Sequence, residues 1–322
     1  MLGLMQDWPL LCHRIIDHAA AYHVEREVVT RSVEGPIHRT NYREIRTRAL
    51  KLAQCLDRYG LRQGQRAATL AWNSWRHMEV WYAIAGIGAV YHTVNPRLFP
   101  DQIVYILNHA EDRLLFADIS FIGLLESLQD KLPAIESFII LTDREHMPET
   151  ALRNAVCYED WLAEADGDFA WVALDERAAA GMCYTSGTTG DPKGVVYSHR
   201  SNVLHAMAVN VPDMAGLSAM DRVLPAVPMF HANGWSIPFS APLVGAALVM
   251  PGPRMDGEAI HDLLENEKVT FTDGVPTVWQ MLLQYMEESG KSLSHLKRIA
   301  IGGAACPQAM ARTFELEFGV PV

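Results

Sequence analysis

Short apolar segments of strand length alternate with segments of helical period along most of this chain. The helical period is clearest in residues 42–59, where Ile45, Ala49 and Leu56 recur on one face before Gly60. Alternation of this kind is typical of βαβ units, in which parallel strands form a sheet with helices on both faces. We therefore predict an α/β fold with parallel-rich sheets flanked by helices.

The predicted elements cover most of the chain. The predicted strands are residues 66–72, 114–117, 138–141, 223–227, 247–250, 269–272 and 298–301. The predicted helices are residues 42–59, 75–87, 121–128, 199–210, 259–267, 278–288 and 307–317. A more polar stretch near residues 143–176 predicts a boundary between two α/β subdomains, residues 1–175 and 176–322, and residues 320–322 are predicted to begin a further strand.

Composition excludes some classes of partner. The chain has 322 residues, of which 49% are hydrophobic, and this is enough for a sizeable core. Its formal net charge of −11 argues against a nucleic-acid partner, because binding to a phosphate backbone needs clustered lysine and arginine.

The cysteines and the uncharged stretches indicate a reduced, cytoplasmic protein. The five cysteines are scattered and lack CxxC spacing, which is typical of free thiols rather than disulfides or zinc ligands. Residues 223–253 contain no Asp, Glu, Lys or Arg, but several prolines interrupt them, so no membrane-spanning helix of about 20 residues is predicted. The first residues lack the basic region and long apolar run of a signal peptide.

Residues 184–195 read Tyr-Thr-Ser-Gly-Thr-Thr-Gly-Asp-Pro-Lys-Gly-Val. Glycines allow close approach of the backbone, successive N–H groups form a concavity that binds anions, and a lysine supplies a point charge for phosphate oxygens. The segment is not a Walker loop, because Lys193 follows Pro192 and precedes Gly194. Composition alone leaves open an ordinary polar loop beside a polyphosphate site. The candidate phosphate-binding residues are Thr185, Ser186, Gly187, Thr188, Thr189, Gly190 and Lys193.

Two later segments contain further candidates. His231 follows Pro-Met-Phe and Trp235 lies four residues later, although a lone histidine or tryptophan is more often structural. Gly302, Gly303 and Ala304 follow a predicted strand, where small residues permit close approach of the backbone to a ligand or simply make a tight turn.

The segment 184–195 resembles the signature of the adenylate-forming enzymes, which include acyl-CoA synthetases, luciferases and the adenylation domains of peptide synthetases. The resemblance covers essentially the whole chain. Its other motifs are residues 197–200 (Tyr-Ser-His-Arg), 227–231 (Val-Pro-Met-Phe-His), 274–277 (Gly-Val-Pro-Thr) and 302–305 (Gly-Gly-Ala-Ala). Residues 71–73 (Ala-Trp-Asn) and 94–98 (Val-Asn-Pro-Arg-Leu) are similar to the medium-chain acyl-CoA synthetase branch, which includes ligases for methylthio-substituted short acids such as methylmercaptopropionate.

The resemblance implies a two-step ligase reaction with ATP, Mg²⁺ and CoA. A carboxylate attacks the α-phosphorus of ATP to give acyl-AMP, and a thiol then displaces AMP. By resemblance, the 185–193 loop holds the β- and γ-phosphates and Thr185 contributes to the magnesium site. His231 lines the space near the α-phosphate, Trp235 faces the acyl chain, and Gly302, Gly303 and Ala304 lie near adenine and the substrate carboxyl group.

The resemblance also implies that further elements follow residue 322. The aromatic-Gly-x-Thr-Glu motif, the ribose-binding aspartate and a small C-terminal domain with its lysine come later in this family. We therefore interpret the chain as the N-terminal portion of the enzyme and expect it to be inactive alone. A homodimer is a family expectation.

Two alternatives remain at this point. Amino-acid adenylation domains carry an aspartate after the phenylalanine, whereas Phe230 is followed here by His231, so a buried substrate ammonium would lack a partner. The other alternative is a non-catalytic nucleotide-binding module. The leading prediction is an ATP-dependent ligase that joins CoA to a medium-chain or short substituted fatty acid.

Overall fold

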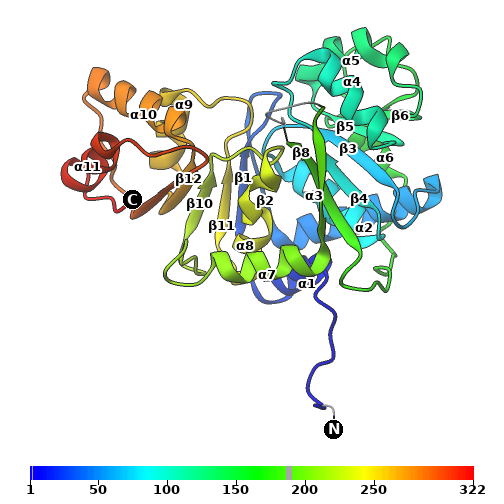
Figure 1. The fold of residues 1–322 in the computed structure, drawn as a ribbon, viewed down its shortest axis with the longest axis horizontal. Coiled ribbons are helices and arrows are strands. Elements are labelled where there is room, and N and C mark those ends of the chain that lie inside the picture. The colour runs from blue at the N-terminus through cyan, green and yellow to red at the C-terminus, as the bar shows by residue number, and fades with distance from the viewer. Residues whose placement is uncertain (2, 186–190) are drawn as a thin grey trace.

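The computed structural model describes residues 1, 3–185 and 191–322, whose strands form two sheets (Figure 1). The strands are β1 (Glu27–Arg31), β2 (Ile37–Asn41), β3 (Arg66–Leu70), β4 (Val90–Thr93), β5 (Leu114–Ala117), β6 (Ser137–Ile140), β7 (Ala155–Cys157), β8 (Ala179–Thr185), β9 (Lys193–Ser198), β10 (Arg222–Pro225), β11 (Ala247–Met250), β12 (Phe271–Gly274) and β13 (Arg298–Ile301). One sheet has the order β13-β12-β10-β11-β1-β2, and the other has the order β7-β6-β5-β3-β4-β8-β9. In each sheet the described pairs are parallel except for one antiparallel pair at an edge, β1–β2 and β8–β9 respectively.

Helices connect the strands and cover both faces of both sheets. The α-helices are α1 (Cys12–Tyr22), α2 (Tyr42–Tyr59), α3 (Trp75–Gly86), α4 (Pro100–His109), α5 (Ile122–Leu128), α6 (Tyr158–Ala163), α7 (His199–Val209), α8 (Ile237–Val244), α9 (Gly257–Asn266), α10 (Pro276–Ser289) and α11 (Gln308–Glu317). Three shorter helical segments are η1 (Ile119–Phe121), η2 (Gln129–Lys131) and η3 (Ala232–Ser236).

Three hydrophobic clusters show how these layers pack. The largest joins α1, α2, α3, α7 and α8 to the facing sides of both sheets. A second packs α9, α10 and α11 on the outer face of the six-stranded sheet, and a third packs α4 and α5 on the outer face of the seven-stranded sheet (Figure 1). Since helices pack on both faces of both sheets, the predicted α/β fold with parallel-rich sheets between helices is confirmed.

The strands cross the subdomain boundary that we predicted at residue 175. Strands β1 and β2, from the start of the chain, extend the six-stranded sheet, whose other strands lie after residue 221. Strands β8 and β9, which follow residue 175, complete the seven-stranded sheet. Sheet membership therefore does not follow the division into residues 1–175 and 176–322, and the two α/β subdomains stay a prediction.

Residues 320–322, predicted to begin a strand, do not form one. The Ile299 backbone N–H donates to the Pro321 carbonyl at 3.0 Å, so this segment lies beside β13 at the sheet edge. Proline has no N–H to donate, and the segment makes no regular ladder with β13. Elsewhere in the described part of the chain, no helix is both long and apolar enough to cross a bilayer.

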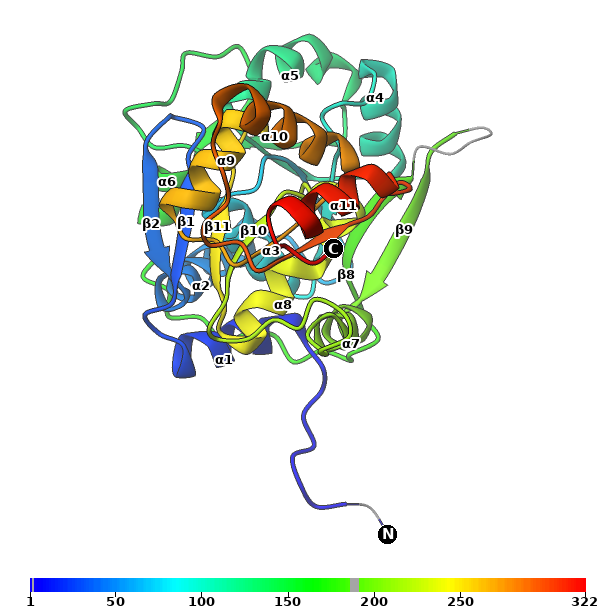
Figure 2. The same cartoon turned by 90° about the vertical axis from the view of Figure 1, so that its left-hand side faces the viewer.

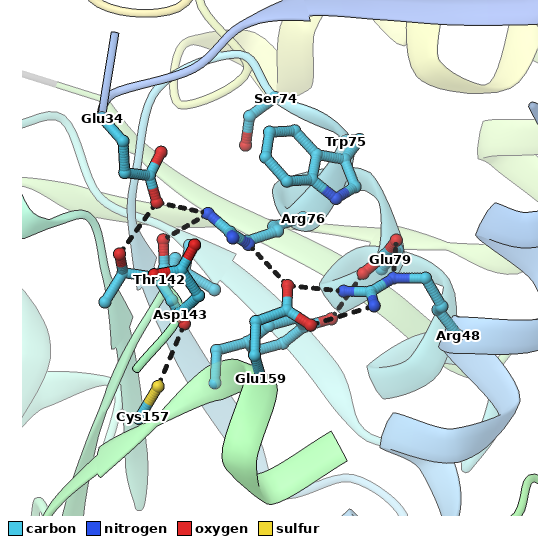
Figure 3. Close-up of polar contacts among 12 residues, drawn as sticks. Glu34, Arg48, Ser74, Trp75, Arg76, Glu79, Thr142, Asp143, Cys157 and Glu159 are labelled. Carbon is cyan, nitrogen blue, oxygen red and sulfur yellow. Dashed lines mark hydrogen bonds and ion pairs between the residues drawn. The ribbon is translucent and has the colours of Figure 1, made fainter. Parts of the chain in front are cut away.

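An ion-pair network joins α2, α3 and α6 to the turn between β1 and β2 (Figure 3). Arg76 in α3 pairs with Glu159 in α6 at 2.8 Å and with Glu34, after β1, at 2.6 Å. Arg48 in α2 pairs with the same Glu159 at 2.8 Å and with buried Glu79 of α3 at 2.7 Å. This network fixes the relative positions of α2, α3 and α6.

Candidate functional site

The candidate phosphate loop connects the antiparallel strands β8 and β9. Thr185 ends β8 and lies opposite Lys193, the first residue of β9, and both side chains are exposed. The remaining candidates, residues 186–190, lie outside the described part of the chain. Strand β9 is at the free edge of its sheet (Figure 2), so the hairpin projects a hydroxyl and an ammonium group toward solvent.

Tyr184 anchors the base of this hairpin. Its hydroxyl lies 2.6 Å from Nδ1 of His109 in α4. A Cβ on Gly194, its partner in β9, would come within 3.1 Å of the Tyr184 ring. The glycine therefore leaves room for the ring to pack across the hairpin.

A second group of candidates gathers at the carboxyl ends of β10, β12 and β13. These strands are parallel neighbours, so the segments that follow them meet at one edge of the sheet. The Gly302 N–H donates to the Gly274 carbonyl at 3.1 Å and joins the turns after β13 and β12.

Asn73, which follows β3 in the other sheet, holds the segment after β10. Its Nδ2 donates to the carbonyls of Pro225 and Val227, each at 2.9 Å. Its Oδ1 accepts from the Met229 N–H at 2.6 Å. This buried amide therefore sets the path of the backbone that leads to His231.

His231 precedes a left-handed turn. The next five residues all have positive φ: 39° at Ala232, 42° at Asn233, 58° at Gly234, 48° at Trp235 and 65° at Ser236. Such conformations are costly for residues with a Cβ, and they persist only where the surrounding structure imposes them. Strain of this kind clusters at functional sites, which supports the assignment of this segment to the site.

The turn places Trp235 against the small residues after β13. A Cβ on Gly302 would lie 2.6 Å from Cη2 of Trp235, and one on Gly303 would lie 3.7 Å from Cζ2. The indole is half-buried. We predicted close approach of the backbone to a ligand here. In this structure the Trp235 ring approaches Gly302, and the approach of a ligand stays a prediction.

Trp235 also lines a cavity of about 680 Å³ between the six-stranded sheet and α7. Its walls come from α7, η3, β12 and β13, with Tyr197 of β9 on one side. Strand β8 is a neighbour of η3, so the base of the phosphate-loop hairpin lies beside this turn. The volume of the cavity is within the range found for small-molecule binding sites.

One ionisable side chain in the cavity wall is Asp273 of β12, which is only 2% exposed. Burial raises the pKa of Asp273 to about 8, and nearby backbone N–H groups, that of Val227 first, only partly oppose this rise.

The metal-binding capacity of the described residues is limited. Residues 1, 3–185 and 191–322 contain no group of three or more His, Cys, Asp or Glu side chains arranged to bind a metal ion. Thr185 offers a single hydroxyl oxygen. That donor fits a magnesium ion held mainly by phosphate oxygens and water, not one enclosed by protein ligands.

The structure brings some of the sequence candidates together and leaves others apart. Thr185 pairs with Lys193, and Trp235 packs on Gly302 and Gly303. His231 and Ala304 are exposed near these groups in sequence. Sequence reasoning missed Asn73 as a positioning residue and Asp273 in the cavity wall. The signal for Asp273 was a carboxylate inside an apolar strand pattern, whereas nothing local marked the contacts of Asn73.

Comparison with known sequences shows the family of this chain. Residues 16–322 match the family model described as AMP-binding enzyme. The chain is 46% identical over 320 residues to 3-methylmercaptopropionyl-CoA ligase of Ruegeria lacuscaerulensis, covering 99% of this chain and 59% of that protein. It is 44% identical over 322 residues to a medium-chain-fatty-acid–CoA ligase of Ectopseudomonas oleovorans, again covering 59% of it. The chain therefore spans about 59% of the length of these relatives.

Solved structures share the fold. The anthranilate CoA ligase AuaEII in complex with anthranoyl-AMP superposes with a TM-score of 0.86 at 23% identity, covering 98% of this chain and 60% of that one. A long-chain-fatty-acid-CoA ligase from Archaeoglobus fulgidus gives a TM-score of 0.85 at 24% identity, covering 100% of this chain and 64% of that one. Because the family model matches residues 16–322, nearly the whole of this chain, the chain belongs to the AMP-binding enzyme family.

Proposed function

We propose that the protein carrying this chain is an ATP-dependent acyl-CoA ligase that activates a medium-chain or short substituted fatty acid through acyl-AMP. The observation that carries the proposal is the packing of Trp235 on Gly302 beside a cavity of about 680 Å³, at the carboxyl ends of the parallel strands. The names of the sequence relatives, ligases for 3-methylmercaptopropionate and medium-chain fatty acids, support the same substrate class.

In the first half-reaction a substrate carboxylate oxygen attacks the α-phosphorus of ATP, and pyrophosphate leaves. Such transfers depend on positioning and charge neutralisation more than on covalent help from the protein. We assign the β- and γ-phosphates to the hairpin loop between Thr185 and Lys193, including residues 186–190. Magnesium would arrive bound to ATP, with the Thr185 hydroxyl as one further oxygen donor.

In the second half-reaction the CoA thiol attacks the acyl carbonyl carbon, and AMP leaves. His231 precedes the strained turn and is exposed, so we assign it to the space where the carboxylate meets the α-phosphate. We assign adenine to the turn of Gly302, Gly303 and Ala304, where the backbone is open to solvent at Gly303 and Ala304. Trp235 would contact the acyl chain, since a flat apolar ring suits alkyl and thioether groups.

The setting of the enzyme is also part of the proposal. All five cysteines are free thiols, which favours a reducing, cytoplasmic compartment. We propose a homodimer and no nucleic-acid partner, in keeping with the net charge of −11.

The test is release of AMP by the full-length protein in the presence of ATP and CoA. The acids are methylthiopropionate, butyrate, octanoate, palmitate and one amino acid, and the control omits CoA. We expect CoA-dependent turnover that is highest with a short or medium aliphatic acid. Turnover with the amino acid alone, or none with any acid despite ATP binding, would contradict the proposal.

A further inference from the structure

Three residues that line the cavity each have one buried side-chain polar atom without a hydrogen-bond partner among the described residues. These atoms are Oδ1 of Asp273, Nδ2 of Asn233 and Oγ of Ser236. Their residues are 2%, 5% and 6% exposed. Buried polar atoms are nearly always hydrogen-bonded, because leaving one unpaired destabilises the folded protein. Three such atoms around one cavity indicate a ligand with polar groups of its own.

The sheet register directs Asp273 into the cavity. Asp273 lies opposite Ala300 of β13, and Ala300 lines the same cavity. Phe271, two residues earlier on β12, also lines it, as expected for side chains on one face of a strand. On the other face, a Cβ at Gly274 would meet Trp279 of α10. The carboxyl group is therefore part of the cavity wall rather than of the packing against α10.

The other two atoms limit the kind of group that fits. Oδ1 of Asn233 accepts from the Thr93 hydroxyl at 3.0 Å, which leaves its Nδ2 as a free donor. The Ser236 hydroxyl can donate or accept. An ammonium group would suit Asp273 but would face the Asn233 donor unfavourably. A hydroxyl group can donate to Asp273 and accept from Asn233 or Ser236.

The rest of the cavity is suited to a carbon chain. Val209 of α7, Met214, Ile237 of α8 and Phe271 supply apolar surface to its walls. Burying an alkyl chain there is favourable, while a plain alkyl acid leaves the three polar atoms unpaired.

We propose that the acyl cavity selects carboxylic acids that carry a hydroxyl group on the chain, away from the reacting carboxyl group, and that Asp273 is the residue that recognises this hydroxyl. The inference rests on the proposed ligase function and narrows its substrate class.

The experiment compares specificity constants of the full-length protein for butyrate, hexanoate and octanoate with those for the omega-hydroxy and omega-amino counterparts of each. The variants are Asp273→Leu, which removes the acceptor at similar volume, and Asp273→Asn, which keeps an acceptor oxygen. Asp118→Asn is the matched control, because Asp118 is also a buried carboxyl, 2% exposed, but does not line the cavity.

We expect at least one hydroxy acid to exceed its alkyl counterpart in kcat/KM by about tenfold or more, because a site built around a substrate hydroxyl discriminates against analogues that lack it. Asp273→Leu should abolish that ratio or invert it, whereas Asp273→Asn and Asp118→Asn should retain a preference for the hydroxy acid. The ratio within one variant is unaffected by a loss of folded protein. If Asp273→Leu yields no folded protein, the ratios of kcat/KM for hydroxy and alkyl acids in the wild type and in Asp273→Asn still test the inference.

Three outcomes would overturn the inference. Equal kcat/KM values of the wild type for alkyl and hydroxy acids would contradict the inference but not the ligase function. A preference for the omega-amino acids would show that the cavity recognises an ammonium group instead of a hydroxyl group. If no acid is turned over, both the proposed ligase function and the inference are contradicted.

Discussion

The backbone of residues 232–236 makes the strongest residue-level case for a functional site. Five successive residues have positive φ, and only one of them is glycine. Each such residue with a Cβ costs of order 1–2 kcal/mol. Contacts on either side hold the turn: Thr93 bonds to Asn233, and the Ser240 hydroxyl donates to the Ser236 carbonyl at 3.0 Å. The result is that Trp235 lies on Gly302, at the edge of the cavity.

Replacing Gly302 by alanine tests that contact. The added Cβ would lie 2.6 Å from Cη2 of Trp235, so the indole must move. Overpacking of this kind costs about 1–3 kcal/mol, and we expect Gly302→Ala to change tryptophan fluorescence and lower kcat/KM for the acid in the full-length protein.

Gly123→Ala is the matched control, because a Cβ at this α5 position meets nothing within 4 Å. It should be neutral or stabilising by about 0.5–1 kcal/mol in urea unfolding. Unchanged tryptophan fluorescence together with unchanged acid kinetics in Gly302→Ala would refute the packing that we describe.

Among the elements, the segment after β10 depends on a residue from the other sheet. Asn73 makes three buried hydrogen bonds to its backbone, including the 2.6 Å bond from the Met229 N–H. Asn73→Leu leaves those backbone groups unpaired, and we expect a loss of about 3 kcal/mol in the free energy of unfolding.

The measurement is urea unfolding, with kcat and KM for the acid determined in the full-length protein. Asn108→Ala is the control, since Asn108 makes one exposed hydrogen bond to the Lys131 carbonyl. A positioning role predicts that Asn73→Ser, with a shorter polar side chain, recovers part of kcat. If Asn73→Leu and Asn108→Ala change the free energy of unfolding and the kinetic constants equally, the hydrogen bonds of Asn73 do not position the segment after β10.

The network around Arg76 makes stability depend on pH. Burial by itself would raise the pKa of Glu34 and Glu159. At Glu34 the charge of Arg76 and hydrogen bonds that include those from Thr142 and Arg76 outweigh burial, and at Glu159 Arg48, followed by Arg76, does so. Both pKa values therefore lie below the ordinary range. A depressed pKa contributes stability above the unfolded value of about 4.3, and that stability is lost as pH falls through the folded pKa.

Arg76→Met removes the shared cation and leaves buried Glu34 without it. We expect a loss of about 3 kcal/mol near pH 7. The difference from the wild type should shrink as the pH falls from about 4.3, where the carboxyls of the unfolded chain begin to bind protons, through the lower pKa values of the folded carboxyls.

The control is Arg177→Met, which breaks an exposed pair with Asp175 and should have little effect. Urea unfolding at several pH values checks both variants. A difference that stays constant with pH would contradict the electrostatic explanation.

The sequence predicted elements well where periodicity or apolar runs were strong. The bounds of α2, β5, β11 and β13 agree with the predicted ranges. Helix α8 was not predicted because Pro238 and Pro242 interrupt its sequence pattern, yet Pro238 lies in its first turn, where proline is tolerated. The parallel pairing of β1 with β11 joins segments more than two hundred residues apart, and no local pattern encodes it.

At the scale of the whole molecule, the candidate site needs both sheets. The phosphate-loop hairpin belongs to the seven-stranded sheet, whereas Trp235 and Gly302 follow strands of the six-stranded sheet. The side chains of Asn73 and Thr93, from the seven-stranded sheet, hydrogen-bond to Pro225 at the end of β10 and to Asn233 after it. The sequence indicated the loop, His231 and the glycine turn, because each is a local motif. It could not indicate the cavity, since Asp273, Asn233 and α7 meet only through tertiary packing.

The most direct test of the ligase proposal is the first half-reaction alone. Labelled pyrophosphate should exchange into ATP on the full-length protein, without CoA, only when an aliphatic carboxylic acid is present. This exchange requires reversible formation of acyl-AMP, so it isolates the step that the Trp235–Gly302 site is proposed to support. Acid-dependent exchange is the result we predict. Binding of ATP without exchange for any carboxylic acid would contradict the proposal and leave a non-catalytic nucleotide-binding protein.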